Sequence, residues 1–336
     1  MPNLKKLCAE TADLCKLLVR EDKWLICINA DPDAMASAMA LKRIMARRVA
    51  DVDIASINEI KRPDNLSMIR CLRIPLLPLT PELAERYDRF AIVDSQPHHN
   101  EAFANREYRI VIDHHPPDPE NAALGSFNRI SPEYGSCSAI MTEYLRSMKI
   151  RPGKLLATAL VYGIKTDTQS FERQFSDADV KAFGYLHKYS NKLLLQKIVH
   201  SEYKKEWLKY FSKAFRKMLF VGKRGLFIYM GRLESPDILV ILADFFTRVH
   251  GLSWDMICGV CEKKGVAIFR GDGLRGNMGK LAEKTFGEIG SAGGHKAMAR
   301  AEIDLTILNG EDPEIFFYKR LTGDRLPKGF RDMKTP

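Results

Sequence analysis

The chain has 336 residues, of which 46% are hydrophobic and 28% are charged. This composition is typical of globular proteins and excludes fibrous and largely disordered chains. The length exceeds the usual size of a single domain, which predicts two domains. The 52 Lys and Arg residues outnumber the 42 Asp and Glu residues and give a formal net charge of +10. This charge favours phosphate-bearing ligands, but it does not choose among nucleic acids, membranes and acidic proteins.

The sequence predicts a cytoplasmic protein. Apolar runs fall short of the roughly 20 residues that span a bilayer, and Glu and Asp interrupt the apolar positions of the basic N-terminal segment, so we do not expect a signal peptide. The seven cysteines are an odd number scattered over a long chain, which indicates a reducing compartment. Cys258 and Cys261 form a CxxC pair in a predicted strand, where residues three apart point to opposite faces, so a shared metal is not expected.

The first half of the chain alternates predicted helices and strands. Apolar residues between positions 4 and 20 recur at helical spacing. A predicted strand at 24–29 ends at the acidic turn ADPD, and strong helix formers fill positions 34–49. Further strands are expected at 52–58, 89–93 and 109–112, a short apolar segment at 74–79, a Ser-capped helix at 135–148 and a helical or mixed segment at 155–164. This alternation predicts a mostly parallel sheet flanked by helices.

The character of the chain changes after about residue 190. Residues 191–225 are basic and amphipathic, which predicts one or two helices linking two domains. We then expect a smaller α/β domain with a strand near 226–231, an apolar helix around 238–249, two strands within 254–269 and a glycine-rich tail. Residues 308–336 are expected to be a terminal extension. The predicted boundaries are therefore 1–190, 191–225 and 226–336.

Carboxylates directly follow several predicted apolar runs of the first domain. An isolated aspartate there is most often a turn residue or a helix cap. However, the carboxyl ends of parallel strands meet at one edge of the sheet, where ligands bind. Several carboxylates crowd together only if a cation offsets their repulsion, and carboxylates with neutral imidazoles suit Mn²⁺ or Mg²⁺. Two such ions would activate water for attack at phosphorus. The residues concerned are Asp31, Asp33, Asp94, Asp113, His114, His115 and Asp167.

Four segments resemble the successive motifs of DHH-family phosphoesterases. They are DPDAMASA at 31–38, VDS at 93–95, DHH at 113–115 and GIKTDTQSF at 163–171. In the second domain, SAGGHKAMA at 291–299 resembles the GGGH motif of the DHH-associated C-terminal domain, and FRGDGLRGN at 269–277 resembles the arginine-bearing segment before it. The resemblance covers about residues 20–305, and it rests on the common order of motifs that are individually weak.

The resemblance implies an α/β catalytic domain, a smaller α/β substrate-binding domain and an active site in the cleft between them. It also implies two divalent ions, Mn²⁺ or alternatively Mg²⁺ or Co²⁺. Asp94 would bridge the two metals and Asp31 would hold the first. Asp113 would orient a histidine ligand, and His115 would face the substrate phosphate. The second metal would be held by Asp33, His114 and Asp167.

In the second domain the resemblance assigns nucleotide binding to four residues. The two glycines would allow close approach of backbone amides to phosphate or base, and the arginine would supply a planar fork. Ala292 stands where the family has a glycine, and Arg300 falls where small residues are usual, so the substrate is less well defined than the reaction. The four residues are Arg270, Gly293, Gly294 and His295.

Cys27 is the main departure from the family pattern, because a histidine metal ligand is usual at this position. A thiolate is a poor ligand for Mn²⁺. Three outcomes are open: Cys27 binds a softer metal, the first metal site is weak or filled from elsewhere, or Cys27 lies in the core. His98 and His99 are candidates for compensation, with surface loop residues as the simpler interpretation.

Within the family, the chain length excludes the large exonuclease type, and the GGH sequence argues against the pyrophosphatase branch. The remaining resemblance is to enzymes that hydrolyse short oligoribonucleotides and dephosphorylate 3′-phosphoadenosine 5′-phosphate (pAp), with water as the nucleophile. The alternatives are hydrolysis of cyclic di-AMP or linear pApA, and a nucleotide-binding regulator whose metal site has decayed. The expected partner is short single-stranded RNA or a small nucleotide. No membrane partner is expected, and dimerisation is left open.

Overall fold

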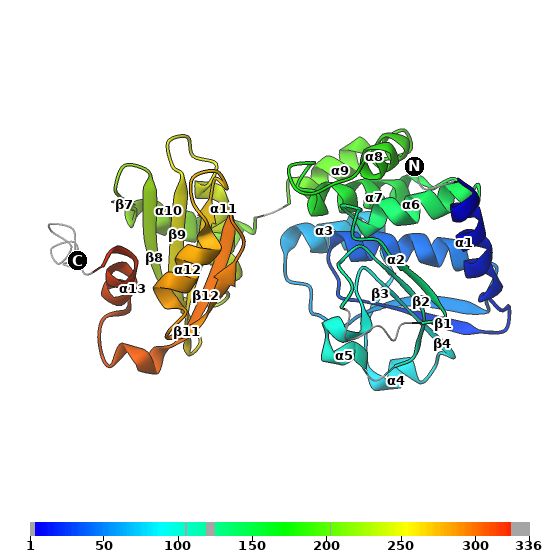
Figure 1. Cartoon of the computed structure of the whole chain (residues 1–336), viewed down its shortest axis with the longest axis horizontal. Helices are drawn as coiled ribbons and strands as arrows, with labels where there is room; N and C mark the ends of the chain where they lie inside the picture. The colour runs from blue at the N-terminus through cyan, green and yellow to red at the C-terminus, as the bar shows by residue number, and fades with distance from the viewer. Residues whose placement is uncertain (1–3, 105, 119–124, 202, 324–336) are drawn as a thin grey trace. The chain divides into compact units, whose positions relative to one another are not determined.

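The structure is a computed structural model that describes residues 4–104, 106–118, 125–201 and 203–323. It divides the chain into two units, residues 1–203 and 204–336 (Figure 1). The division falls inside the segment predicted as a linker. Among the described residues, no helix has both the length and the hydropathy to cross a bilayer.

The first unit is built on a parallel sheet whose described strands have the order β3-β2-β1-β4-β5-β6. Each pair of neighbouring strands is parallel, which confirms the predicted sheet. The chain adds strands on one side of β1 and then returns to add β4, β5 and β6 on the other. The topological switch point therefore lies between β1 and β4, where open α/β sheets bind ligands. The strands are β1 (Lys23–Ile28), β2 (Asp51–Ser56), β3 (Leu76–Pro78), β4 (Arg89–Val93), β5 (Tyr108–Asp113) and β6 (Phe127–Ile130).

Helices cover both faces of this sheet. Ile26 and Ile28 of β1 pack into the larger core with α2, α6 and α7, whereas the alternate residues Leu25 and Cys27 pack into a smaller core with Phe103 of α5. Figure 1 shows α4 and α5 on the side of the sheet opposite α2, α6 and α7. The helical elements are α1 (Leu4–Lys16), α2 (Pro32–Met45), α3 (Pro63–Leu72), α4 (Pro81–Ala84), η1 (Pro97–His99), α5 (Glu101–Ala104), α6 (Cys137–Ser147), α7 (Lys154–Asp167), α8 (Asp177–His187) and α9 (Lys192–Val199).

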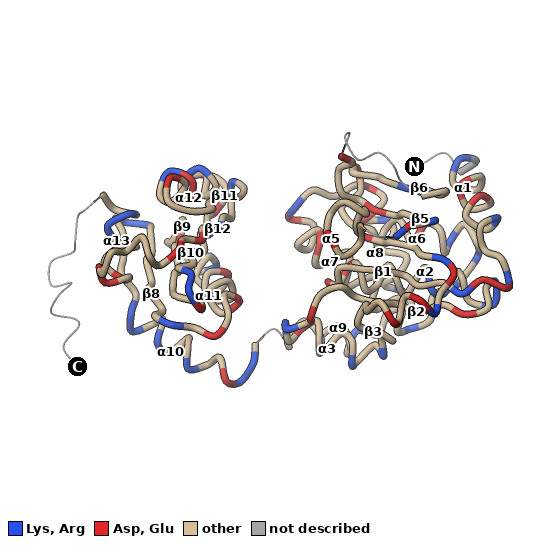
Figure 2. The backbone as a smooth tube through the Cα atoms, turned by 90° about the horizontal axis from the view of Figure 1, so that it is seen from below, with Lys and Arg blue, Asp and Glu red and all other residues tan. Residues whose placement is uncertain are grey.

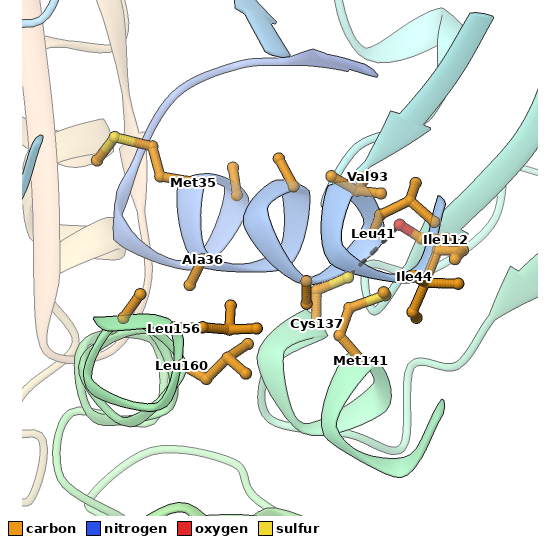
Figure 3. Close-up of a cluster of buried hydrophobic side chains, with 14 of the residues drawn as sticks. Met35, Ala36, Leu41, Ile44, Val93, Ile112, Cys137, Met141, Leu156 and Leu160 are labelled. Atoms are coloured by element: carbon orange, nitrogen blue, oxygen red, sulfur yellow. Dashed lines mark hydrogen bonds between the residues drawn. The ribbon is translucent and has the colours of Figure 1, made fainter. Parts of the chain in front are cut away.

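Helix α2 is central to the first unit because it packs against both α6 and α7. Buried small side chains on α2, among them Ala36, permit close approach of the neighbouring helices, as Figure 3 shows. Gly163 of α7 lies at the tightest point. A Cβ atom built there would lie 2.4 Å from Ser138 Oγ and 2.8 Å from Asp33 Oδ1. The glycine of the GIKTDTQSF segment is therefore required by packing.

The second unit contains a mixed sheet whose described strands have the order β11-β12-β10-β9-β8-β7, with only β8 and β9 parallel. Helices α12 and α13 contribute to the core on one face, and α10 and α11 to the core on the other. The elements are η3 (Lys205–Trp207), α10 (Leu208–Arg216), β7 (Leu219–Val221), β8 (Gly225–Leu233), α11 (Asp237–Phe246), β9 (Trp254–Cys261), β10 (Lys264–Gly271), α12 (Met278–Phe286), β11 (Gly290–Gly294), β12 (Met298–Asp304), η4 (Leu305–Leu308) and α13 (Pro313–Thr322).

Two sequence predictions have clear outcomes in the second unit. Cys258 and Cys261 lie in cores on opposite faces of the sheet, as expected for residues three apart in a strand. The prediction of a terminal extension at 308–336 is wrong for residues 313–322. They form α13, which Asp312 caps and whose Phe317 is 1% exposed. Residues 324–336 lie outside the described residues.

Basic residues occur on both units, including α1 and α10 (Figure 2).

Candidate metal centre

Four predicted ligand residues from the ends of four elements of the first unit lie together. Asp33 is in the first turn of α2, Asp94 follows β4, His114 follows β5 and Asp167 ends α7. One ligand atom from each lies within 4.8 Å of the others. His114 Nε2 is 3.4 Å from Asp94 Oδ1 and 3.1 Å from Asp167 Oδ2. We call these four residues the metal cluster.

The Asp33 carboxylate is held by the N-terminus of α6. Its Oδ2 accepts a hydrogen bond from Cys137 N at 2.6 Å, and its Oδ1 accepts one from Ser138 N at 2.8 Å. The first amides of a helix have no partner within the helix, and its dipole favours negative charge there. The Asp33 carboxylate is therefore fixed by two backbone N–H groups, which do not titrate.

The backbone is strained at two points near the metal cluster. Asp94 has a φ of 58°, and Gln169, Ser170 and Phe171, just after Asp167, have φ values of 46°, 60° and 69°. Residues other than glycine rarely adopt this left-handed conformation, and it concentrates at functional sites. Asp94 N donates to Ile112 O at 2.8 Å, which anchors the strained residue to β5.

Burial dominates the electrostatics of the metal cluster. It raises the pKa of Asp33 to about 6, with the Asp167 carboxylate adding to the effect. The pKa of Asp94 is well above its usual value because of burial and then the nearby Asp33 and Asp31. Burial lowers the pKa of His114, but Asp167 and Asp33 outweigh this effect and raise it to about 9. The cluster thus concentrates negative charge that a cation would neutralise.

The donor atoms fit a divalent metal ion. Asp94 Oδ1 and His114 Nε2 are buried and make no hydrogen bond with the described residues. Buried polar atoms without a well-formed hydrogen bond are costly, and coordination by an ion would satisfy both. Carboxylate oxygens and an imidazole nitrogen match Mn²⁺, Mg²⁺ or Co²⁺ better than a thiolate-preferring ion.

Asp31 lies beside the metal cluster but is not one of its four members. It caps α2, because its side chain accepts a hydrogen bond from Ala34 N at 2.9 Å. Burial raises its pKa, and the Asp33 carboxylate adds to this. Its role as a ligand of the first metal stays a prediction.

Asp113 contacts His115 and not the ring of His114. Its Oδ1 is 2.8 Å from His115 Nδ1, and its Oδ2 accepts a hydrogen bond of 2.7 Å from Gln96 Nε2. The ring atom His114 Nδ1 instead lies 3.3 Å from Tyr134 O. Asp113 therefore pairs with the histidine predicted to face phosphate, whereas a backbone carbonyl faces the histidine predicted to bind metal. In extended backbone, residues two apart point to the same side. Asp113 at the end of β5 therefore meets His115 and not the ring of His114.

Sequence reasoning missed Gln96. It is 1% exposed, and its amide also lies 3.3 Å from the carbonyl oxygens of His115 and Pro116. The only signal was its position two residues after Asp94, because a glutamine has no pattern of its own. Sequence reasoning also missed the backbone groups of Tyr134, Cys137 and Ser138, which no residue type reveals.

Cys27 lies in the core. It is fully buried and packs in the smaller core with Ala55, Ile92 and Phe103. Burial raises the pKa of its thiol to about 12, so it is protonated at neutral pH. No candidate ligand group among the described residues includes it.

His99 lies near Asp113 and His115 rather than near the residues of the metal cluster. One of its ring nitrogens, an Asp113 oxygen and a His115 nitrogen lie within 4.8 Å of one another. Its Nδ1 accepts a hydrogen bond from Gln96 N at 3.2 Å. The His98 and His99 rings are 4.6 Å apart between centroids, and those of His99 and His115 are 5.7 Å apart. Compensation for Cys27 by His98 or His99 stays a prediction.

The predicted nucleotide-binding residues lie at one end of the second sheet. Gly293 and Gly294 end β11, and Arg270 on β10 is opposite Met298 of β12. Gly294 has a φ of 151°, and a Cβ there would lie 2.4 Å from Met298 O, so only glycine fits. Arg270 Nε donates to Asp244 Oδ1 at 2.6 Å. The side chain of His295 is exposed, and its backbone N–H donates to Met298 O at 2.7 Å.

The first unit is thus an open parallel sheet with a cluster of carboxylates and a histidine, a candidate metal centre, at its switch point. Residues 23–164 match the model of the DHH family, N-terminal domain. The matched residues lie within the first unit and include the segments at 31–38, 93–95 and 113–115 that resemble motifs of this family.

The chain is similar to two proteins in sequence and to a solved structure in fold. Two uncharacterised proteins of Methanocaldococcus jannaschii are 34% identical over 83% of this chain and 29% identical over 56% of it. The alignments span 57% and 56% of the lengths of these relatives. The crystal structure of an exopolyphosphatase-related protein from Bacteroides fragilis superposes with a TM-score of 0.70 over 97% of this chain and 98% of that chain. At 16% identity, this likeness shows a common fold.

Proposed function

We propose that the chain is a divalent-metal-dependent phosphoesterase that hydrolyses short oligoribonucleotides, pAp or both, with water as the nucleophile. The observation that carries the reaction class is the metal cluster, in which three carboxylates and the buried His114 Nε2 lie within 4.8 Å of one another. Its position at the switch point of a DHH-type sheet supports the same conclusion.

The residues of the cluster have separable roles in this proposal. In it, Asp94 would bridge the two ions and Asp31 would hold the first. Asp33, His114 and Asp167 would hold the second. Divalent ions, proposed to be two Mn²⁺, would supply Lewis-acid activation of water and of the phosphoryl group. The α6 amides keep Asp33 in place as a ligand.

His115 is suited to meet the substrate phosphate. The side chain is 48% exposed, although its Nδ1 is held by the buried Asp113. The hydrogen bond to Asp113 raises the pKa of His115, which favours the cationic form that attracts phosphate. With Nδ1 engaged, Nε2 is the ring nitrogen left to donate to a phosphate oxygen.

The second unit would supply substrate binding. The exposed glycine-rich end of β11 offers backbone amides without side chains, and His295 beside it adds a donor. Arg270 is anchored by Asp244, so its planar group is held in place near this end of the sheet. The net charge of +10 favours a phosphate-bearing partner, which we propose is a short single-stranded RNA or a small nucleotide.

The test compares initial rates on a labelled RNA trimer, pAp, pApA and cyclic di-AMP, each with Mn²⁺, Mg²⁺, Co²⁺ or Zn²⁺. We expect turnover of the trimer or pAp, abolished by Asp94→Asn and retained by Asp13→Asn, which changes an exposed aspartate of α1. Faster hydrolysis of pApA or cyclic di-AMP would reject the proposed substrate. Nucleotide binding without hydrolysis under any of the four ions would reject the enzyme in favour of a regulator.

A further inference from the structure

A cavity of about 480 Å³ lies in the first unit, away from the metal cluster. It is bounded by α1, α6, α8 and the segment that follows β6, and Tyr134 lies in its wall. None of the metal-cluster residues lines it. We call it the Tyr134 cavity. Its volume is within the range of sites for small organic ligands.

Basic side chains from different elements line the Tyr134 cavity. Arg129 of β6 is 9% exposed, and its guanidinium is fixed by Glu10 at 3.3 Å and by the Tyr134 hydroxyl at 3.4 Å. Arg146 of α6 lies over the Tyr185 ring, 5.0 Å from its centroid, and no carboxylate of the described residues is within ion-pair distance of it. Lys181 of α8 and Lys6 of α1 also line the cavity, and their Nζ atoms lie 3.9 Å from Asp177 Oδ2 and from Glu10 Oε1, respectively.

Three acidic residues, Glu133, Glu143 and Asp177, line the same cavity, so its four basic residues exceed them by one. Glu143 Oε2 accepts a hydrogen bond of 2.8 Å from the Tyr134 hydroxyl, and burial raises the pKa of Glu143. The side chain of Asp177 is 95% exposed. The first residues of α8 also line the cavity, where a capping box of Ser176 and Asp179 already occupies the helix N-terminus. The methyl groups of Ala178 and Ala182 provide apolar surface beside these charges.

The wall of the cavity is directly connected to the metal cluster. Tyr134 O faces His114 Nδ1 at 3.3 Å. Gly135 N and Ser136 Oγ donate to Asp179 of α8 at 2.8 and 2.9 Å. The next two residues, 137 and 138, hold Asp33 through their amides. Residues 134–138 thus contact α8 on one side and two metal-cluster residues on the other.

We propose that the Tyr134 cavity is a second ligand site, which binds a small organic phosphate, and that its occupancy is transmitted to the metal cluster through residues 134–138. Two guanidinium groups and a lysine from three elements suit a dianionic phosphate. The cavity is larger than inorganic phosphate needs, and the alanine methyls and the Tyr134 ring would contact the organic part. The binding step does not depend on the activity proposed above.

The test uses AMP as the probe and full-length protein freed of metal with EDTA. NMR signals of alanine methyl groups report on the Tyr134 cavity, and those of histidine rings report on the metal cluster. We expect saturable shifts of the Ala178 and Ala182 methyls and of the His114 ring, with no shift of the Ala214 methyl of α10 in the second unit. Because AMP could also reach the metal cluster directly, the His114 shift must weaken together with the methyl shifts when the cavity is mutated. The Arg146→Glu and Lys181→Glu changes together should weaken this binding at least tenfold. Lys188→Glu, at the other end of α8 and outside the cavity, should leave it unchanged.

Each contrary result rejects a defined part of the proposal. Methyl signals of Ala178 and Ala182 that do not move with AMP, or equal weakening by Lys188→Glu, would reject the site. Tighter binding of citrate than of AMP at the same methyls would reject the phosphate in favour of a carboxylate ligand. Methyl shifts without a change at His114 would reject the transmission to the metal cluster.

Discussion

Asp113 and His115 form a hydrogen-bonded pair with 2.8 Å between Oδ1 and Nδ1, in which the carboxylate is fully buried and the imidazole is half exposed. The other oxygen of Asp113 accepts from Gln96, which is itself buried. The position of His115 therefore depends on Asp113 and, through it, on Gln96, which is not part of the metal cluster. Partners of this kind orient the groups that they hold.

Replacing Gln96 with leucine should weaken catalysis without removing the metal. The change deprives the buried Asp113 of a donor, so the His115 ring loses its fixed orientation. We expect kcat/KM to fall by about 10- to 100-fold, with Mn²⁺ affinity within twofold of wild type because the metal cluster is intact. Steady-state kinetics and Mn²⁺ titration would measure the two effects. Gln196→Leu, on the exposed surface of α9, is the matched control. Unchanged kcat/KM in Gln96→Leu would show that Asp113 holds His115 unaided.

Gly163→Ala should damage both stability and metal binding. The new Cβ would meet Ser138 Oγ and Asp33 Oδ1, so the α2, α6 and α7 contact must open. Overpacking of this kind costs about 1–3 kcal/mol, and displacement of Asp33 should lower Mn²⁺ affinity. Chemical denaturation and metal titration would test this. Gly184→Ala in α8 faces open space and should stabilise the protein by about 0.5–1 kcal/mol. Equal stability of the two variants would contradict the packing argument.

Much of the first unit was predictable because β1, β4 and β5 are short apolar runs that end at or just before aspartates. The same local pattern placed Asp33, Asp94, His114 and Asp167 at element ends, where the parallel sheet brings them together. Local patterns did not give the strand order or the switch point between β1 and β4, because these depend on contacts between distant segments. The segment 155–164 was ambiguous because a helix buried on nearly all sides lacks an amphipathic period.

The supporting contacts of the site were not predictable. Backbone atoms hold Asp33 and face His114, and a backbone atom carries no residue signature. Helix α13 is different, since Asp312 followed by proline is a recognisable helix start that was overlooked among charged residues. The pairing of Asp113 with His115 follows from strand geometry that becomes visible only once the end of β5 is known.

The metal-free protein should lose stability as pH rises from about 4 to 9. The pKa of Asp33 is raised to about 6 and that of His114 to about 9 in the folded state, so the folded protein binds more protons than the unfolded chain. The stability that each group contributes is complete below its unfolded pKa and is lost as pH passes through its folded pKa. The contribution of Asp33 to stability is therefore lost between about pH 4 and pH 6, and that of His114 between about pH 6.5 and pH 9.

Urea unfolding of EDTA-treated protein across this range would measure the effect. Asp33→Asn should flatten the part between pH 4 and 6, whereas Asp13→Asn, an exposed change, should not. Saturating Mn²⁺ should reverse the trend, because deprotonated ligands bind metal better at higher pH. Stability of the metal-free protein that rises over the same interval would contradict the charge assignment of the cluster.

Cys27→Ala distinguishes a core cysteine from a metal ligand. The thiol packs among apolar side chains of the smaller core and has a pKa of about 12, so we expect it to contribute packing alone. The variant should lose about 1 kcal/mol of stability, comparable to removing one buried methylene-sized group, and its Mn²⁺ and Zn²⁺ affinities should stay within twofold of wild type. Cys258→Ala, in the core of the second unit, is the matched control for the loss of a buried thiol. A tenfold or larger fall in the affinity for either ion, in Cys27→Ala but not in Cys258→Ala, would assign Cys27 to the first metal site instead.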